Sequence, residues 1–379
     1  MVADAPLEPW AWRPLGAARR AVLLDVLVHG PRSRAELTRR TGLSRTTLSR
    51  LTRDLTADGL LADSGPAAAT GPGRPSDVVA LVPDAAHLVG MKLTGDALYV
   101  AVTDLAAQVR STAEVPLASR AFDDVVAEMA AAVARVRAAV PRVAAVGVCL
   151  AGDVRLVDGL AWVTGSDFLG WDRVPLEAAL VAATGLPTAV SNDVQCLTVA
   201  HHWFGAGVGA ATFAVVAVGE GIGAGLVVDG DLVRGAHGRP GKVSHVPVDA
   251  DGPPCDRGHP GCASGVVTVP AVLRATGAAS FPAVLEAAAA GDARCDAALR
   301  AAARALGAVV AQLVNLTDPE KVVVTGEARE VATYARAQLD ASLRRRLDPS
   351  VEAPPVEVHP FAFTDYAWGA AISAIRHLL

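Results

Sequence analysis

The 379-residue chain is 52% hydrophobic and 19% charged, which favours two or three compact domains over a disordered chain. Its formal net charge of -5, from 34 Lys and Arg against 39 Asp and Glu, excludes a surface that is basic throughout, so any nucleic-acid site must be local. Five unevenly spaced cysteines predict a reducing cytoplasm rather than a secreted disulfide framework. The N-terminus is acidic and interrupted by proline, unlike a signal peptide, and we expect a soluble protein with no membrane partner.

Arginine is concentrated near the N-terminus, in the segment 19–53. The acidic residues of this segment are Asp25 and Glu36, and Asp54 follows just beyond it. Its arginines are Arg19, Arg20, Arg32, Arg34, Arg39, Arg40, Arg45, Arg50 and Arg53. Residues 64–76, SGPAAATGPGRPS, lack hydrophobic periodicity and predict a loop or hinge. We therefore expect a small basic domain over residues 1–80, with this linker at its end.

Three short helices are expected in this domain. The apolar stripe of RAVLLDVLVHG predicts a helix that ends at Gly30. Ser33 and Glu36 form a capping box that begins a second helix. Ser44 caps a third helix, RTTLSRLTRDL, whose leucines face inward, and DGLLADSG then predicts the start of a β-hairpin. A helix, a short turn with a glycine, a second polar helix and a hairpin together predict a winged helix-turn-helix that binds an operator in double-stranded DNA.

The outward side chains of the third helix are of the types that contact DNA. Arginine binds guanine through two hydrogen bonds, and Thr and Ser contact phosphates or thymine methyl groups. Arg74, in Gly-Arg-Pro at the far end of the hairpin, could enter the minor groove, or it could be a simple loop residue. The predicted DNA contacts are Arg34, Arg45, Thr46, Thr47, Ser49, Arg50 and Arg74. The alternative is a small helical interaction domain whose arginines are only solvated.

From His87 onward the pattern is α/β. Apolar, β-branched runs that predict strands alternate with Ala-rich helical stretches, and the runs are 98–105, 143–152, 187–193, 212–228 and 321–326. Apolar residues at three- and four-residue spacing predict helices over 123–140, 296–316 and 366–379. Sheets flanked by helices are the expected architecture.

Several motifs of this region resemble the ROK family (repressors, open reading frames and sugar kinases). They are a strand-turn-strand over 87–104 and the stretches 162–176, 191–200, 218–230, 241–262 and 314–326. The resemblance implies a two-lobed, actin-like ATPase (ribonuclease H-like) fold, with one lobe over 85–190, completed by a helix at 364–379, and a second over 191–363. For a regulator that binds a pseudo-palindromic operator, we expect a homodimer or tetramer.

Phosphate-binding positions depart from those of the family's kinases. Where these kinases carry an Asp and a glycine pair in the first turn, this chain has Lys92 and Thr94, and in the second glycine loop Glu220 replaces a Thr. A cation in the metal site and a carboxylate beside polyphosphate oppose nucleotide binding, so we expect no ATP and no enzyme activity. Asp193 matches the family's catalytic base, and its role here is predicted to be vestigial: ligand contact or a strand-end cap.

The sugar contacts that the resemblance implies are Asp167, Asn192, Asp193, Lys242, His245 and Ser264. Lys242 and Ser264 stand where the family typically has Glu, so acceptors for vicinal hydroxyls are lost. A phosphorylated or acidic sugar, a non-sugar metabolite or no ligand at all is therefore more plausible than a neutral hexose as the small-molecule effector.

The family's structural zinc site is matched in part. His245, Cys255 and Cys262 are present, whereas Arg257 replaces a third Cys. His259 could complete a set of two His and two Cys, or the zinc could be lost and the loop could fold on its own turns. The function predicted from the whole sequence is a transcriptional regulator that acts as a repressor and does not catalyse phosphoryl transfer. The alternatives are an active sugar kinase with an accessory DNA-binding domain and a regulator whose ligand pocket is vestigial.

Overall fold

The protein is described from a computed structural model, which covers residues 12–66 and 77–379. Its residue contacts divide the chain into two units. Unit 1 consists of Met1–Cys196 and Tyr366–Leu379, and unit 2 consists of Leu197–Asp365. Each unit is described by itself.

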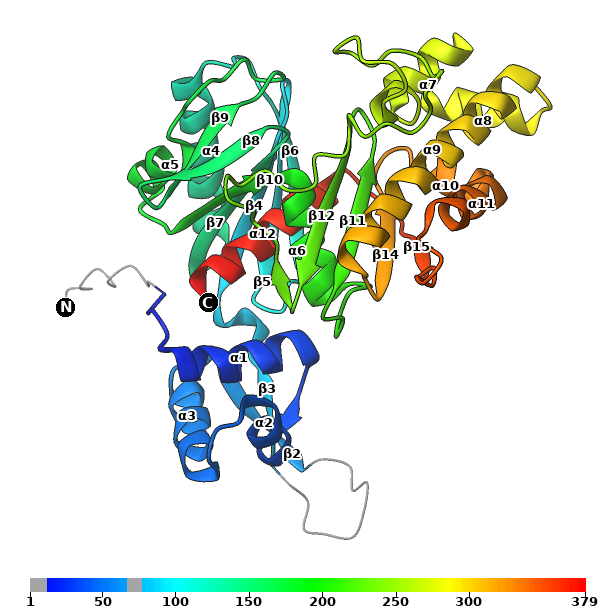
Figure 1. Cartoon of the computed structure of the whole chain (residues 1–379). Coiled ribbons are helices and arrows are strands. Elements are labelled where there is room, and N and C mark those ends of the chain that lie inside the picture. Colours follow the sequence, from blue (N-terminus) through cyan, green and yellow to red (C-terminus); the bar gives the residue numbers. More distant parts are fainter. Residues whose placement is uncertain (1–11, 67–76) are drawn as a thin grey trace. The chain divides into compact units, whose positions relative to one another are not determined.

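The N-terminal part of unit 1 holds three helices and a small sheet (Figure 1). The helices are α1 (Ala17–His29), α2 (Arg34–Thr41) and α3 (Arg45–Ala57). Strands β2 (Leu61–Pro66) and β3 (Asp77–Leu81) pair antiparallel, and the short β1 (Arg32–Ser33) adds to the other edge of β3. These are the helices and the hairpin that the sequence predicts.

Local sequence signals set the ends of these helices. The side chain of Ser33 accepts a hydrogen bond from the Glu36 amide, and the Glu36 carboxylate accepts one from the Ser33 amide, so the predicted capping box is confirmed. Ser44 caps α3 by accepting from the Thr47 amide at 3.1 Å. Gly42 ends α2 in the left-handed conformation, with φ of 70°, which glycine adopts without strain.

The rest of unit 1 is built on a five-stranded sheet with the order β10-β7-β4-β5-β6. Its strands are β4 (His87–Leu93), β5 (Ala97–Asp104), β6 (Val109–Pro116), β7 (Val143–Leu150) and β10 (Thr188–Asn192). Strand β7 runs parallel to β4 and β10, whereas β4, β5 and β6 are joined antiparallel. Helices α4 (Phe122–Ala139) and α5 (Leu176–Thr184) pack together, and β8 (Asp153–Val157) forms a hairpin with β9 (Leu160–Gly165).

The C-terminal helix α12 (Thr364–Leu378) lies directly on this sheet. Gly90 of β4 and Gly147 of β7 permit the contact, because an added Cβ would lie 1.9 Å from the Ala367 carbonyl oxygen and 1.8 Å from that of Ala370, respectively. The helix backbone therefore approaches the sheet more closely than any side chain would allow.

Unit 2 has a second five-stranded sheet with the order β13-β12-β11-β14-β15. The strands are β11 (Phe213–Val218), β12 (Ile222–Val228), β13 (Asp231–Leu232), β14 (Lys321–Thr325) and β15 (Val356–Val358). The helices are α6 (Asp193–Phe204), whose first turn belongs to unit 1, and α7 (Val269–Thr276), α8 (Phe281–Ala289), α9 (Ala293–Thr317), α10 (Glu330–Tyr334) and α11 (Arg336–Arg346).

Helix α9 is the centre of the hydrophobic core of unit 2. It packs against α7, α8, α10 and α11, and its apolar side chains join those of β11 and β14 in one cluster. In the described residues α9 is also the one helix that is long and apolar enough to cross a membrane, but 67% of the qualifying window is buried inside the protein, as expected of a core helix. The two sheets flanked by helices confirm the predicted α/β class.

Candidate functional site

Helix α3 presents a row of polar side chains on one face. With 3.6 residues per turn, positions 46, 49, 50 and 53 lie within one arc. Leucines on the opposite face are buried. The exposed residues of the helix's outer face are Arg45, Thr46, Ser49, Arg50 and Arg53. Arg53 was not among the predicted contacts, although its spacing from Thr46 and Ser49 placed it in this row.

Three predicted contacts have partners inside the domain, and one of them, Arg50, forms an exposed ion pair with Asp54 at 3.9 Å. The Thr47 hydroxyl lies 2.9 Å from the Ser44 hydroxyl at the start of α3. The Arg34 guanidinium donates to the Thr52 hydroxyl at 3.3 Å and to the Asp63 carboxylate at 2.9 Å, which ties α2 to α3 and β2. DNA contact by Arg34 and Thr47 stays a prediction, and Arg74 lies outside the described residues.

A buried ion pair lies where the sequence predicts a lost metal site. Lys92 of β4 places its Nζ 2.6 Å from Oδ2 of Asp193, the first residue of α6. Lys92 is 3% and Asp193 8% exposed, and the ammonium also lies 4.4 Å from the ring centroid of Tyr366 in α12. The other oxygen of Asp193 accepts from the Val194 amide at 2.9 Å. Asp193 is thus both the partner of a cation and a cap for α6.

Side-chain hydrogen bonds close the turn between β4 and β5. The Thr94 hydroxyl lies 2.8 Å from Oδ1 of Asp96 and accepts from the Ala97 amide at 3.0 Å. The Arg120 guanidinium donates to the Gly95 carbonyl at 2.5 Å. A phosphate would have to compete with the Thr94 hydroxyl for an amide of this turn, which opposes anion binding there.

The glycine loop between β11 and β12 carries negative charge. Glu220 is exposed within it, and Glu327, which follows β14, lies against Gly219 so closely that an added Cβ would be 1.8 Å from its Oε2. Carboxylates at these positions repel polyphosphate. The sequence argument missed Glu327, although its place just after a strand that neighbours β11 could have indicated it.

The sugar contacts implied by resemblance are divided between the two units. In unit 1, Asp167 is exposed, and Asn192 donates to the Gly152 carbonyl at 3.1 Å while its oxygen accepts from the Val194 amide. In unit 2, Lys242 is exposed, and the buried Ser264 hydroxyl has no hydrogen-bond partner among the described residues. A shared ligand for these residues stays a prediction.

The four predicted metal ligands lie together. One ligand atom from each of His245, Cys255, His259 and Cys262 falls within 4.8 Å of every other, and Nδ1 of His245 is 3.5 Å from Sγ of Cys255. Tetrahedral zinc with bonds of about 2.0–2.3 Å places ligand atoms about 3.3–3.8 Å apart, so the group fits zinc after a small contraction. Burial raises the pKa of the Cys255 thiol, but hydrogen bonds from the Arg257 and His259 amides outweigh it and hold the pKa below its usual value.

Both the N-terminal segment and the larger α/β region of the chain match models of known protein families. A family model described as "ROK family" matches residues 88–376, and one described as "HVO_A0261 N-terminal domain" matches residues 13–75. A glucokinase of Halalkalibacterium halodurans is 30% identical over 178 residues, which cover 42% of this chain and 54% of the glucokinase. This match therefore spans about half of that enzyme.

Longer matches are found to regulators. The DNA-binding transcriptional repressor Mlc of Escherichia coli is 24% identical over 346 residues, covering 86% of this chain and 84% of Mlc. The crystal structure of a ROK family transcriptional regulator, a homologue of the E. coli MLC protein, superposes with a TM-score of 0.81 at 23% identity and covers 95% of this chain and 96% of that one. This likeness shows that the fold is shared. By its match over residues 88–376, the chain belongs to the ROK family.

Proposed function

We propose that the protein is a DNA-binding transcriptional regulator, a repressor, whose segment 1–80 is a winged helix-turn-helix domain. The observation that carries the proposal is the outer face of α3, where exposed Arg, Thr and Ser side chains stand on a helix whose other face is buried. The match to a repressor over most of its length supports it. In this proposal α3 enters the major groove, β2 and β3 form the wing, and Arg74 reaches the minor groove.

The test is the affinity of the full-length protein for operator DNA, which genome-wide mapping of bound fragments would identify. Arg45→Ala and Arg50→Ala should each weaken binding by about 1–3 kcal/mol, which is about 5- to 150-fold. Arg274→Ala is the control, since it removes an exposed arginine from α7 in unit 2. If Arg45→Ala and Arg50→Ala bind operator DNA as tightly as Arg274→Ala, and the salt dependence of binding stays that of the wild-type protein, the assignment is contradicted.

We further propose that the kinase-like part, over 85–190 with 364–379 and over 191–363, does not transfer phosphate. Three observations support this: the Lys92–Asp193 ion pair, the closed turn at Thr94 and the carboxylates at the second glycine loop. Phosphoryl transfer depends on charge neutralisation and positioning, and these residues oppose both. We expect it to act as the effector-binding and oligomerising part of a cytoplasmic homodimer or tetramer.

An active sugar kinase is the second candidate, because Asp193 is retained and a glucokinase is among the relatives. A coupled assay across hexoses with ATP separates the two functions. Turnover in the wild-type protein that disappears in Asp193→Asn would establish the kinase and refute the non-catalytic proposal. Thermal shifts with neutral, phosphorylated and acidic sugars would test for an effector; no shift with any of them would favour a vestigial pocket.

A structural zinc ion held by His245, Cys255, His259 and Cys262 is part of the proposal, because the donor set is of the type that zinc binds. Metal content of the purified protein tests it. One zinc per chain is expected, with loss in Cys255→Ser and reduction in His259→Ala. Metal content unaffected by His259→Ala would show that His259 is not a ligand.

A further inference from the structure

A cavity of about 440 Å³ lies on unit 2, and its lining residues do not include those of the glycine loop. Its walls are formed by α9, α11 and the loop that follows His245, and they include Ala301, Arg304, Ala305, Asp249, Arg345 and Arg346. This volume is in the range of small-molecule sites. Ala301 and Ala305 of α9 line the cavity beside the exposed Arg304.

The polar groups of this cavity are mainly cationic. Arg304, Arg345 and Arg346 line it together with a single carboxylate residue, Asp249. In the described part of the chain no hydrogen bond or ion pair engages the guanidinium of Arg304 or Arg345. A local excess of positive charge within a protein of net charge -5 attracts anions.

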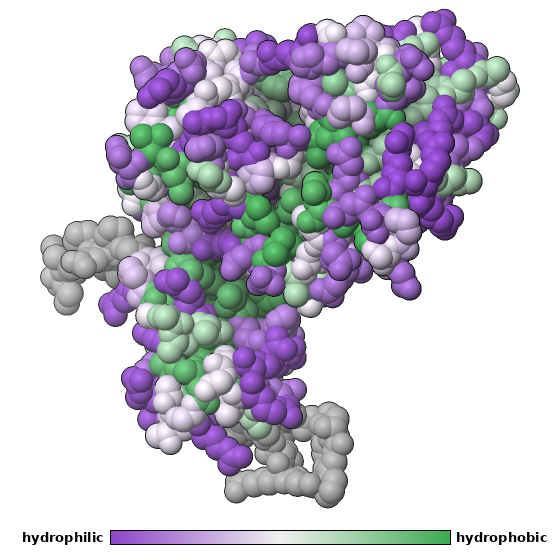
Figure 2. Space-filling model, viewed as in Figure 1, coloured by the Kyte–Doolittle hydropathy of each residue, from purple (hydrophilic) through white to green (hydrophobic). Residues whose placement is uncertain are grey.

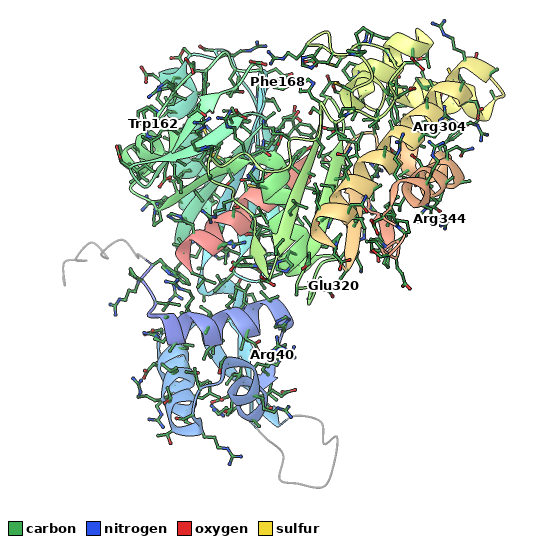
Figure 3. The ribbon with its side chains drawn as sticks, viewed as in Figure 1. Arg40, Trp162, Phe168, Arg304, Glu320 and Arg344 are labelled. Carbon is green, nitrogen blue, oxygen red and sulfur yellow. The ribbon has the colours of Figure 1, made fainter. Side chains whose placement is uncertain are left out.

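Helix-end electrostatics explains only part of this arrangement. Arg344, Arg345 and Arg346 end α11, where cations interact favourably with the helix dipole. Arg304 is in the interior of α9, so the dipole does not account for it. Figure 3 shows Arg304 and Arg344 on these two neighbouring helices, and in Figure 2 hydrophilic residues gather over the part of unit 2 that carries α11.

We propose that this cavity binds a small metabolite through an oxyanion, phosphate or carboxylate, which is held between Arg304 of α9 and Arg345 of α11. Guanidinium groups bind both anions through paired, charge-assisted hydrogen bonds. The two helices are already fixed to each other, since the Ser342 hydroxyl donates to the Arg304 carbonyl at 2.7 Å. The backbones that carry the two exposed arginines are therefore held at a fixed separation.

Binding at this cavity is expected to affect the proposed zinc loop. Arg346 donates to the Val248 carbonyl at 2.7 Å, and the Val248 amide donates to the Gly261 carbonyl at 2.8 Å, next to Cys262. One wall of the cavity is thus part of the segment that holds the Cys and His cluster. An anion that bridges α9 and α11 should slow the opening of this segment. The proposal does not depend on DNA binding.

The test is calorimetric titration of the full-length protein with glycerol 3-phosphate and, separately, malonate, at constant ionic strength. One saturable site is expected for at least one probe. Arg304→Gln and Arg345→Gln should each raise Kd about tenfold or more. Arg344→Gln is the matched control, because it removes an exposed arginine of α11 that does not line the cavity, and it should leave Kd unchanged.

The two probes also distinguish the source of the anion. Binding of glycerol 3-phosphate alone identifies a phosphate site, and binding of malonate alone identifies a carboxylate site. Hydrogen exchange of residues 245–262 should slow when the probe binds. The absence of saturable binding for both probes at millimolar concentration would overturn the proposal. Equal weakening by Arg344→Gln and Arg345→Gln would also overturn it, since it would show attraction by net charge alone.

Discussion

The ion pair between Lys92 and Asp193 gives the sharpest test of how the kinase-like site has changed. Lys92→Met removes the ammonium and leaves the buried Asp193 carboxylate without its partner 2.6 Å away. Loss of one member of a buried pair costs about 3–5 kcal/mol, because the remaining charge is neither solvated nor paired. The same change removes the contact between the ammonium and the Tyr366 ring. The amides of α12 and of β4 should therefore both lose protection against hydrogen exchange.

A double-mutant cycle separates the ion pair from packing. Lys92→Met/Asp193→Asn leaves no buried charge, and the amide side chain introduced by the second substitution keeps an oxygen that can accept from the Val194 amide. We therefore expect the double variant to recover about 2–3 kcal/mol of the loss. Lys321→Met is the control, since its pair with Glu357 is 29% and 40% exposed and should contribute at most about 1 kcal/mol.

Native-state hydrogen exchange is the appropriate measurement, because a chain with two units need not unfold in a single transition. Peptides from β4 and α12 report the local free energy of opening around the pair. Single variants that each cost less than about 1 kcal/mol, with additive effects in the double variant, would refute the inference that the pair is buried and coupled.

Two further predictions concern pH and packing. Burial and the nearby His359 lower the pKa of His201 to about 4. In the unfolded chain the same imidazole binds a proton near pH 6.5. The free energy of unfolding should therefore fall by about 2–3 kcal/mol between pH 6.5 and 4. In denaturant titrations across this range, His201→Gln should reduce the loss and the exposed His377→Gln should not; equal pH profiles would contradict the assignment. Gly147→Ala should destabilise unit 1 by about 3 kcal/mol or more. Gly165→Ala, in the same unit and with nothing within 4 Å of its added Cβ, should leave the stability of unit 1 unchanged.

Much of the N-terminal segment could be predicted because its signals are local. The cap at Ser33, the turn at Gly42 and the leucine spacing of α3 each depend on residues within a few positions of one another. Runs of β-branched residues indicated β5, β7, β10, β14 and the region of β11 and β12 for the same reason, whereas β6, β13 and β15 were not predicted. The partners of Arg34 were not foreseen, because Asp63 is 29 residues away and only the folded hairpin brings it near.

The contacts that define the altered site are mostly long-range. Lys92 and Asp193 are separated by 101 residues, and no periodicity relates them to each other or to Tyr366. Likewise, the cavity at Arg304 and Arg345 forms only where α9 packs on α11. The spacing of residues in the sequence does not predict this packing. The metal cluster was accessible because its ligands fall within one loop of 18 residues, 245–262. There the family resemblance indicated His245, Cys255 and Cys262, and the ligand chemistry of zinc indicated His259.

Retention of Asp193 is therefore weak evidence for catalysis. A catalytic base must offer an oxygen to the substrate hydroxyl, but here one oxygen receives the Lys92 ammonium and the other receives the Val194 amide. Both interactions stabilise the fold, because they pair a buried charge and satisfy the start of α6. The carboxylate would thus be required for stability even if no phosphoryl transfer ever took place. A replacement of Lys92 alone would leave that charge unpaired, so it is expected to cost more stability than the replacement of both residues together.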